Sequence, residues 1–147
     1  PAQVGEALQV LLQIQPMSTN ELTTDQMKAV VVAYAAAHSA GDIDAIAAIF
    51  AEDAVVADPV DKPAFVGRAA VREFFAGTHE FAESLELVVT GPIRAVDHFA
   101  AAPLRAITSM GGAKFAVDII DVFTFNDDGL VTEMKAYWTA TDIAQID

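Results

Sequence analysis

The chain has 147 residues, a length that fits a single domain with one hydrophobic core. Its apolar fraction of 54% exceeds the usual range of about 45–50%, but Asp and Glu interrupt every apolar run, which argues against a membrane-spanning helix. The formal net charge of −13 argues against nucleic acid and anionic membranes as partners, because both select basic patches.

The segment 1–16 is not typical of a secretory signal. It lacks a basic start and a small-residue cleavage site after a long apolar run. Met17, which is followed by Ser-Thr-Asn, is interpreted as the first residue of the native protein. We therefore interpret 1–16 as a leader or an artificial extension, and 17–147 as a single domain.

The first helix is expected over 24–40. Thr23 and Gln26 have the spacing of a capping box, and apolar residues follow at steps of three and four. Gly41 suits the position just after the helix, where the backbone often turns left-handed. These features predict both ends of the helix.

Two further helices and a short strand are expected between residues 42 and 78. Asp42 can cap a second helix over 43–50, and a strand over 53–58 would end at a proline. A third helix is expected over 68–78, after Gly67. Its apolar stripe contains Val71, Phe74 and Phe75.

From residue 84 onward the apolar pattern changes to the two-residue period of strands. Gly111-Gly112 and Asp127-Asp128-Gly129 are typical of hairpin turns. The expected strands cover 84–90, 93–97, 99–110, 115–125 and 130–141. One face of the last strand would carry Leu130, Met134, Ala136, Trp138 and Ala140. The order of elements predicts an α+β fold with helices packed on one face of a curled antiparallel sheet.

Asp121 is the one polar residue on an otherwise apolar strand face. That face also carries Phe115, Val117, Ile119, Phe123 and Phe125. An ionised carboxylate there would lose hydration, so Asp121 should either meet a cation or keep its proton and donate a hydrogen bond. A neutral carboxylic acid in a dry pocket can stabilise an oxyanion.

Two other polar residues could share a cavity with Asp121. Asp58 ends its strand on the same face as buried apolar residues, and Tyr34 lies on the buried stripe of the first helix. Each has a structural explanation, since Asp before Pro is common in turns and a helical Tyr often packs amphipathically. Together, an aspartate base, a tyrosine and a protonated aspartate can remove a proton next to a carbonyl and stabilise the enolate.

The absence of cysteine excludes disulfides and thiolate chemistry and is compatible with a reducing compartment, so we expect a cytoplasmic protein. The three histidines, His38, His79 and His98, are scattered and lack partners at metal-ligand spacing. We expect no metal.

Five sequence runs resemble bacterial ketosteroid isomerase, a steroid Δ-isomerase. They are Ala57-Asp58-Pro59, Gly67-Arg68 with Phe74-Phe75, Gly91-Pro92-Ile93-Arg94-Ala95, Val117-Asp118-Ile119-Ile120-Asp121-Val122 and Met134-Lys135-Ala136-Tyr137-Trp138. The resemblance covers about 27–143. It implies a cone-shaped α+β fold of the nuclear transport factor 2-like superfamily, a homodimer, and a steroid ligand at the open end.

The resemblance also implies roles for individual residues. Tyr34 would match the oxyanion-hole tyrosine, Asp58 the proton-shuttling base and Asp121 the protonated donor. Apolar or aromatic pocket positions would be matched by Leu104, Val117, Met134 and Trp138. Where family members often carry further tyrosines, this chain has Phe50 and Phe75, so Tyr34 lacks its usual hydrogen-bond network.

The implied reaction is cofactor-independent isomerisation of a 3-oxo-Δ5-steroid to its 3-oxo-Δ4 isomer. Alternatives in the superfamily are a lyase, a hydrolase or a non-catalytic module that binds an apolar ligand. A dehydratase would need a facing histidine and aspartate, for which His38 is the candidate. An epoxide hydrolase would need an Asp-Arg-Asp cluster, but strand parity puts Arg105 on the face opposite Leu104.

Overall fold

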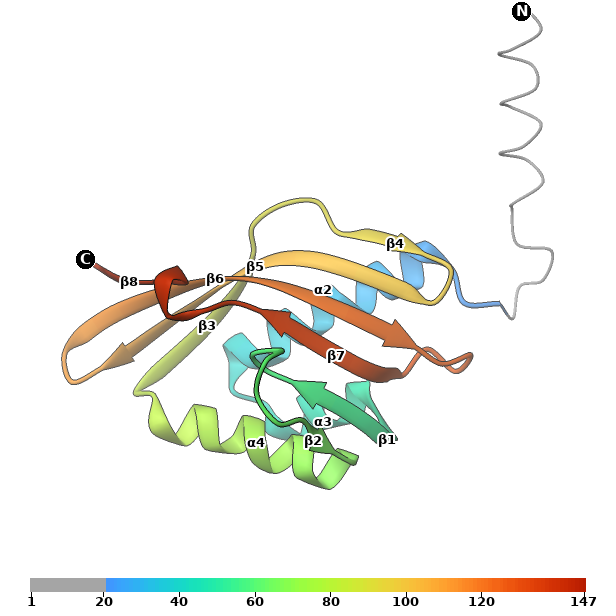
Figure 1. The fold of residues 1–147 in the computed structure, drawn as a ribbon, viewed down its shortest axis with the longest axis horizontal. Helices are drawn as coiled ribbons and strands as arrows, with labels where there is room; N and C mark the ends of the chain where they lie inside the picture. Colours follow the sequence, from blue (N-terminus) through green and yellow to red (C-terminus); the bar gives the residue numbers. More distant parts are fainter. Residues whose placement is uncertain (1–20) are drawn as a thin grey trace, which may run out of the picture.

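The computed structural model describes residues 21–147, so the segment 1–16 and the proposed start at Met17 lie outside the described residues. Three helices lie on one side of a strongly curved, unclosed sheet (Figure 1). They are α2 (Thr24–Ala40), α3 (Ile43–Ile49) and α4 (Arg68–Phe81). The predicted α+β class is confirmed.

The sheet is mixed. Its main strand order is β2-β1-β7-β6-β5-β3, with β4 paired to β5 and β8 paired to β6. The pair β1 and β7 is parallel, and the other pairs are antiparallel. The strands are β1 (Phe50–Ala57), β2 (Phe65–Val66), β3 (Ser84–Val89), β4 (Arg94–Val96), β5 (Phe99–Met110), β6 (Ala113–Phe125), β7 (Val131–Tyr137) and β8 (Ile143–Ile146).

The predicted ends of the first helix are confirmed. The Thr23 hydroxyl accepts a hydrogen bond from the Gln26 backbone N–H, and the Gln26 side chain accepts one from the Thr23 N–H. At the other end Gly41 has φ 65°, the left-handed conformation that glycine adopts without steric cost. Local sequence therefore fixes the length of α2, which carries Tyr34.

Several predicted boundaries were wrong. Phe50 begins β1 instead of ending the second helix, so this strand starts three residues before the predicted range 53–58. Helix α4 continues one turn past Thr78, to Phe81. The last strand stops at Tyr137, and a 3-10 turn (Ala140–Asp142) and the short strand β8 follow it.

The predicted division of the last strand into two faces was also wrong at its start. Val131 is fully buried and Leu130 is only half-buried. The pairing between β6 and β7 shifts register between Thr124 and Phe125, whose partners are Glu133 and Val131. Such a bulge adds one residue to a strand and reverses the alternation beyond it. Met134 and Ala136, which follow the bulge, are both buried and share one face, as predicted.

The hydrophobic core lies between the helices and the concave face of the sheet. Its largest fully buried side chains include Met27, Ile46, Phe50, Leu104, Phe123 and Met134. Full burial of one such side chain contributes roughly 1.5–3 kcal/mol. Within residues 21–147, no helix has both the length and the apolar character needed to cross a membrane.

Candidate active site

Three elements place Tyr34, Asp58 and Asp121. Tyr34 lies on the buried side of α2 and is 3% exposed, and Asp121 lies on the inward face of β6 and is also 3% exposed. Asp58 directly follows β1 and is half-buried. These residues act on one another electrostatically, because Asp58 and Asp121 both contribute to the raised pKa of Tyr34. The structure therefore brings the three predicted residues into one region.

Asp121 is enclosed by small neighbours. Its partners across the two adjacent strands are Ala102 and Ala136, both buried. Its Oδ1 atom is buried and has no hydrogen-bond partner among residues 21–147. Burial, and then the nearby charge of Asp58, raises the pKa of Asp121 well above its usual value. The carboxyl group is thus suited to hold its proton and donate it in a hydrogen bond.

Asp58 is held by Trp138. The indole Nε1–H donates to Asp58 Oδ1 over 2.7 Å. Burial raises the pKa of Asp58, and the hydrogen bond from Trp138 lowers it. The carboxylate is therefore more basic than one in water and has a fixed orientation, two properties required of a general base.

The Tyr34 ring lies among other rings. It makes edge-to-face contacts with His38, Phe123, Phe75 and Phe50, at centroid distances of 4.6, 5.4, 6.1 and 6.2 Å. Burial, then Asp121 and Asp58, raises the pKa of the phenol well above its usual value. A neutral phenol is a hydrogen-bond donor, and neither Phe50 nor Phe75 has a hydroxyl to offer it.

The other predicted pocket residues lie at different depths. Leu104 and Met134 are fully buried, next to the inward positions of β6. Val117 is half-buried and lies four residues along β6 from Asp121. Trp138 is half-buried and contacts Asp58 directly. Of the four, Trp138 has a direct hydrogen bond to one of the three polar residues.

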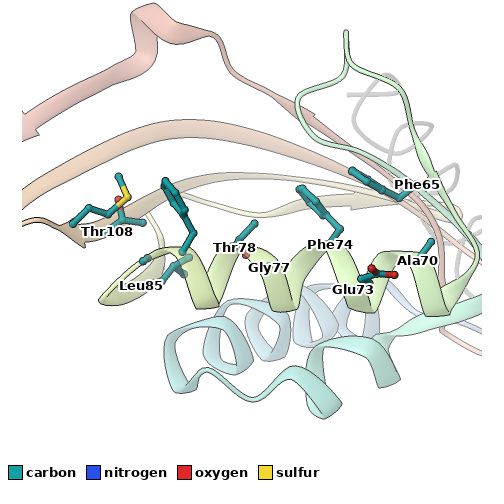
Figure 2. Close-up of a pocket in the computed structure, with 11 residues that line it drawn as sticks. Phe65, Ala70, Glu73, Phe74, Gly77, Thr78, Leu85 and Thr108 are labelled. Atoms are coloured by element: carbon teal, nitrogen blue, oxygen red, sulfur yellow. The ribbon is translucent and has the colours of Figure 1, made fainter.

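A hollow of about 780 Å³ lies between α4 and the ends of β3 and β5 (Figure 2). Phe74 and Thr78 point from α4 toward the sheet, and Thr108 lies on the other side of the hollow (Figure 2). The lining is mostly apolar and comprises Phe65, Ala70, Glu73, Phe74, Gly77, Thr78, Phe81, Ala82, Leu85, Thr108 and Met110. None of the predicted site residues lines this hollow.

The hollow lies on the same face of β5 as the candidate site. Residues with even numbers on this strand point inward, so Thr108 and Met110 in the hollow share a face with Ala102, the strand partner of Asp121. Phe74, which lines the hollow, also contacts Phe75, and Phe75 contacts Tyr34. The hollow and the candidate site are thus separated by the Phe74 and Phe75 rings.

Sequence reasoning missed the hollow, although two patterns could have found it. The inward parity of β5 continues past Leu104 to Met110. On α4, Phe74, Thr78 and Phe81 follow one another at helical spacing, and the predicted helix ended before Phe81.

His38 and Arg105, on which the alternative reactions would depend, do not have the partners or the location that those reactions need. His38 is buried, and its hydrogen-bond partner is His79 rather than an aspartate. Arg105 is exposed and forms an ion pair with Asp118, 2.8 Å away. Within the candidate site, the described part of the chain therefore has neither a histidine that faces an aspartate nor an arginine; the His98–Asp127 pair is exposed on the surface.

Comparison with known proteins gives three similarities. Residues 31–134 match the model of the SnoaL-like domain. A protein of Nocardioides simplex named "Steroid Delta-isomerase" is 39% identical over 118 residues, which cover 80% of this chain and 94% of that protein. A solved structure, described as the epoxide hydrolase/cyclase-like enzyme SalBIII, superposes with a TM-score of 0.75 at 29% identity, covering 82% of this chain and 95% of that one.

Proposed function

The chain belongs to the SnoaL-like domain family, and within that family we propose that it acts as a steroid Δ-isomerase. The observation that carries the proposal is the grouping of a buried Asp121, whose pKa is raised, with Tyr34 and the more basic carboxylate of Asp58. The 39% identity to the isomerase of Nocardioides simplex over 94% of that protein supports it independently.

In the proposed reaction, Asp58 removes a proton from C4 of a 3-oxo-Δ5-steroid. The electrons of the broken C–H bond move toward the carbonyl and give a dienolate, whose oxygen accepts hydrogen bonds from Tyr34 and from neutral Asp121. Asp58 then returns the same proton to C6, which leaves the 3-oxo-Δ4 isomer. One base serves both carbons because a bound ligand presents them to it at high effective concentration.

The electrostatics favour this division of roles. Burial raises the pKa of all three groups, which keeps Tyr34 and Asp121 protonated as donors and makes Asp58 a stronger base. The Trp138 hydrogen bond favours the ionised form of Asp58 and opposes that rise. The side chains can carry out every step without a cofactor.

The apolar hollow would hold the part of the steroid that lies far from the reacting carbons. Its lining of Phe65, Phe74, Leu85 and Met110 suits a rigid, neutral ligand, and burial of apolar surface there supplies binding free energy. The stacked pair Phe65 and Phe74, with centroids 4.3 Å apart, forms one wall (Figure 2).

We also propose a cytoplasmic homodimer. The outer face of the sheet carries Ile120 and Tyr137, paired across β6 and β7 and 51% and 48% exposed. Pro103 is the other strand partner of Ile120. An apolar outer face of this kind is suited to a self-complementary contact between two copies. Sedimentation velocity would detect a dimer.

The alternative reactions of the superfamily have less support. The described residues place His79 against His38, where a dehydratase would need an aspartate, and the arginine that an epoxide hydrolase would need is paired with Asp118 outside the site. Isomerisation would use Tyr34, Asp58 and Asp121, and the effect of both carboxyl groups on the pKa of Tyr34 supports this choice.

The proposal is tested by adding a Δ5-3-ketosteroid and following the ultraviolet absorbance of the conjugated enone. We expect catalysed formation of the enone without any added cofactor. Binding of the steroid without enone formation would contradict the proposed reaction, and consumption of the steroid with loss or gain of water would favour a lyase or hydrolase.

A further inference from the structure

A pair of histidines connects α4 to the Tyr34 side of the candidate active site. His38 lies in the last turn of α2, and His79 lies in the last turn of α4. His38 Nδ1 and His79 Nε2 are 3.0 Å apart, which is the distance of an N–H···N hydrogen bond. The two rings are stacked, with centroids 5.3 Å apart and planes 18° apart.

His38 is also the ring nearest to Tyr34. The centroid distance of 4.6 Å is shorter than those from Tyr34 to Phe123, Phe75 and Phe50. His38 is 4% exposed and contacts Phe75 edge to face at 4.8 Å. Its Nε2 atom is buried and has no hydrogen-bond partner among residues 21–147. Packing and the single bond from His79 therefore fix the orientation of this ring.

We propose that His38, held by His79, is a positioning residue for the Tyr34 phenol. This inference rests on the proposed role of Tyr34 as a donor to the ligand oxygen. His38, Phe50 and Phe75 all contact the Tyr34 ring edge to face, but of these three rings His38 is the one that a side-chain hydrogen bond, to His79, holds in place. Displacement of a reacting group by 1 Å can lower a rate on the order of 100-fold.

The pair works in its neutral form. Burial, and then His79, lowers the pKa of His38 to about 3, and burial lowers the pKa of His79. An N–H···N bond needs one donor and one acceptor, so protonation of both rings would break it. The titratable groups that act on the pKa of Tyr34 are Asp121, on β6, and Asp58, which follows β1.

Two substitutions at His79 distinguish the effect of its hydrogen bond to His38 from the effect of its aromatic ring. His79→Phe keeps an aromatic ring for stacking but removes the nitrogen, whereas His79→Gln keeps an amide near the position of Nε2. We expect His79→Phe to lower kcat about tenfold, with KM within about twofold, because a poorly placed Tyr34 would lose part of its hydrogen bond to the transition state, and a loss about the size of one hydrogen bond lowers a rate by roughly one power of ten. His79→Gln should restore kcat to within about threefold of the unmodified protein.

A spectroscopic readout tests the pair without turnover. The chain has two tyrosines, Tyr34 and the exposed Tyr137, so protein labelled with ¹³C-tyrosine gives two sets of ring signals. We expect His79→Phe to move or broaden the Tyr34 signals and leave those of Tyr137 unchanged. In the unmodified protein, Tyr34 signals should follow the acid titration of the His79 ring. His98→Gln, which alters a surface histidine paired with Asp127, is the matched control.

The results distinguish the two proposals. If His79→Phe leaves both kcat and the Tyr34 signals unchanged, or if His79→Gln loses as much activity as His79→Phe, then the pair does not position Tyr34 through its hydrogen bond. If the protein does not isomerise the steroid but Tyr34 still responds to His79, the proposed reaction fails and the positioning contact stands. If His79→Phe does not fold, absence of the coupled titration in the unmodified protein would overturn the inference.

Discussion

Trp138 donates its indole N–H to Asp58 across 2.7 Å, and this hydrogen bond joins two segments that are 80 residues apart in the sequence. Asp58 follows β1 and Trp138 follows β7, and these two strands form the parallel pair of the sheet. Parallel pairing brings the ends of both strands to the same edge. The orientation of the proposed base is therefore a consequence of sheet topology.

The first prediction concerns this hydrogen bond. Trp138→Phe removes the donor and keeps an aromatic ring, so the pKa of Asp58 should rise further, because the bond from Trp138 lowers it. The acidic limb of the profile of kcat/KM against pH should move to higher pH. The measurement is that profile for both proteins, and an unchanged limb would show that Asp58 does not govern it.

The second prediction concerns Asp121. Asp121→Asn should retain more activity than Asp121→Leu, since the amide still offers an N–H to the ligand oxygen and leucine offers none. Loss of a donor to a developing oxyanion typically costs on the order of 100- to 1000-fold in kcat. Steady-state kinetics of the two variants would check this, and equal losses would argue against a hydrogen-bond role.

Stability against pH gives a third prediction for the same residue. The folded pKa of Asp121 is raised, so the folded state holds a proton that the unfolded state releases. Asp121 should therefore lower the free energy of unfolding as pH rises above the unfolded pKa, with the full cost reached above the folded pKa. Each unit of raised pKa corresponds to about 1.4 kcal/mol. Denaturant titrations at several pH values should show that Asp121→Asn gains stability relative to the unmodified protein as pH rises, and a constant difference would contradict this.

The fourth prediction concerns His38, which should make the free energy of unfolding depend on pH in the opposite direction. Its folded pKa is lowered from 6.5 to about 3, so the unfolded state binds a proton that the folded state excludes. The free energy of unfolding should fall as pH decreases from about 6.5 toward 3, by on the order of 5 kcal/mol in total. His38→Leu should remove this part of the acid destabilisation. The measurement is the pH dependence of unfolding for both proteins, and parallel curves would contradict the lowered pKa of His38.

The fifth prediction concerns the phenylalanine that contacts Tyr34. Phe75→Tyr adds a hydroxyl with little change in volume, on a ring whose centroid is 6.1 Å from that of Tyr34. Bound phenolic ligands should become more ionised, and the rate should change only modestly, because one hydrogen bond within a network contributes about 1 kcal/mol. Ultraviolet spectra of a bound phenol would report its ionisation. An unchanged spectrum would mean that the new hydroxyl does not reach Tyr34.

Sequence predicted the features that depend on local chemistry. The capping box at Thr23 and the turn at Gly41 lie within a few residues of the helix ends that they determine, and the boundaries of α2 were correct. The exceptional polarity of Asp121 on its strand face predicted its burial, because alternation along a strand is a local pattern.

Features that depend on distant partners were not predictable in the same way. The bulge that turns Val131 inward arises from pairing with β6. The sequence of one strand does not determine the register in which it pairs with another strand. His38 and His79 are 41 residues apart and meet only when α2 and α4 are placed on the sheet. The hollow likewise combines separate segments, including β3, α4 and β5.

The central claim is that Asp58 shuttles a proton between two carbons of the ligand. The most direct test is the rate of conjugated-enone formation by Asp58→Asn, compared with the unmodified protein at saturating Δ5-3-ketosteroid. The amide keeps the shape of the carboxylate but cannot accept the proton, so the rate should fall by at least about 10²–10⁴-fold while binding of a phenolic analogue is retained. A rate close to that of the unmodified protein would remove Asp58 from the mechanism and contradict the account.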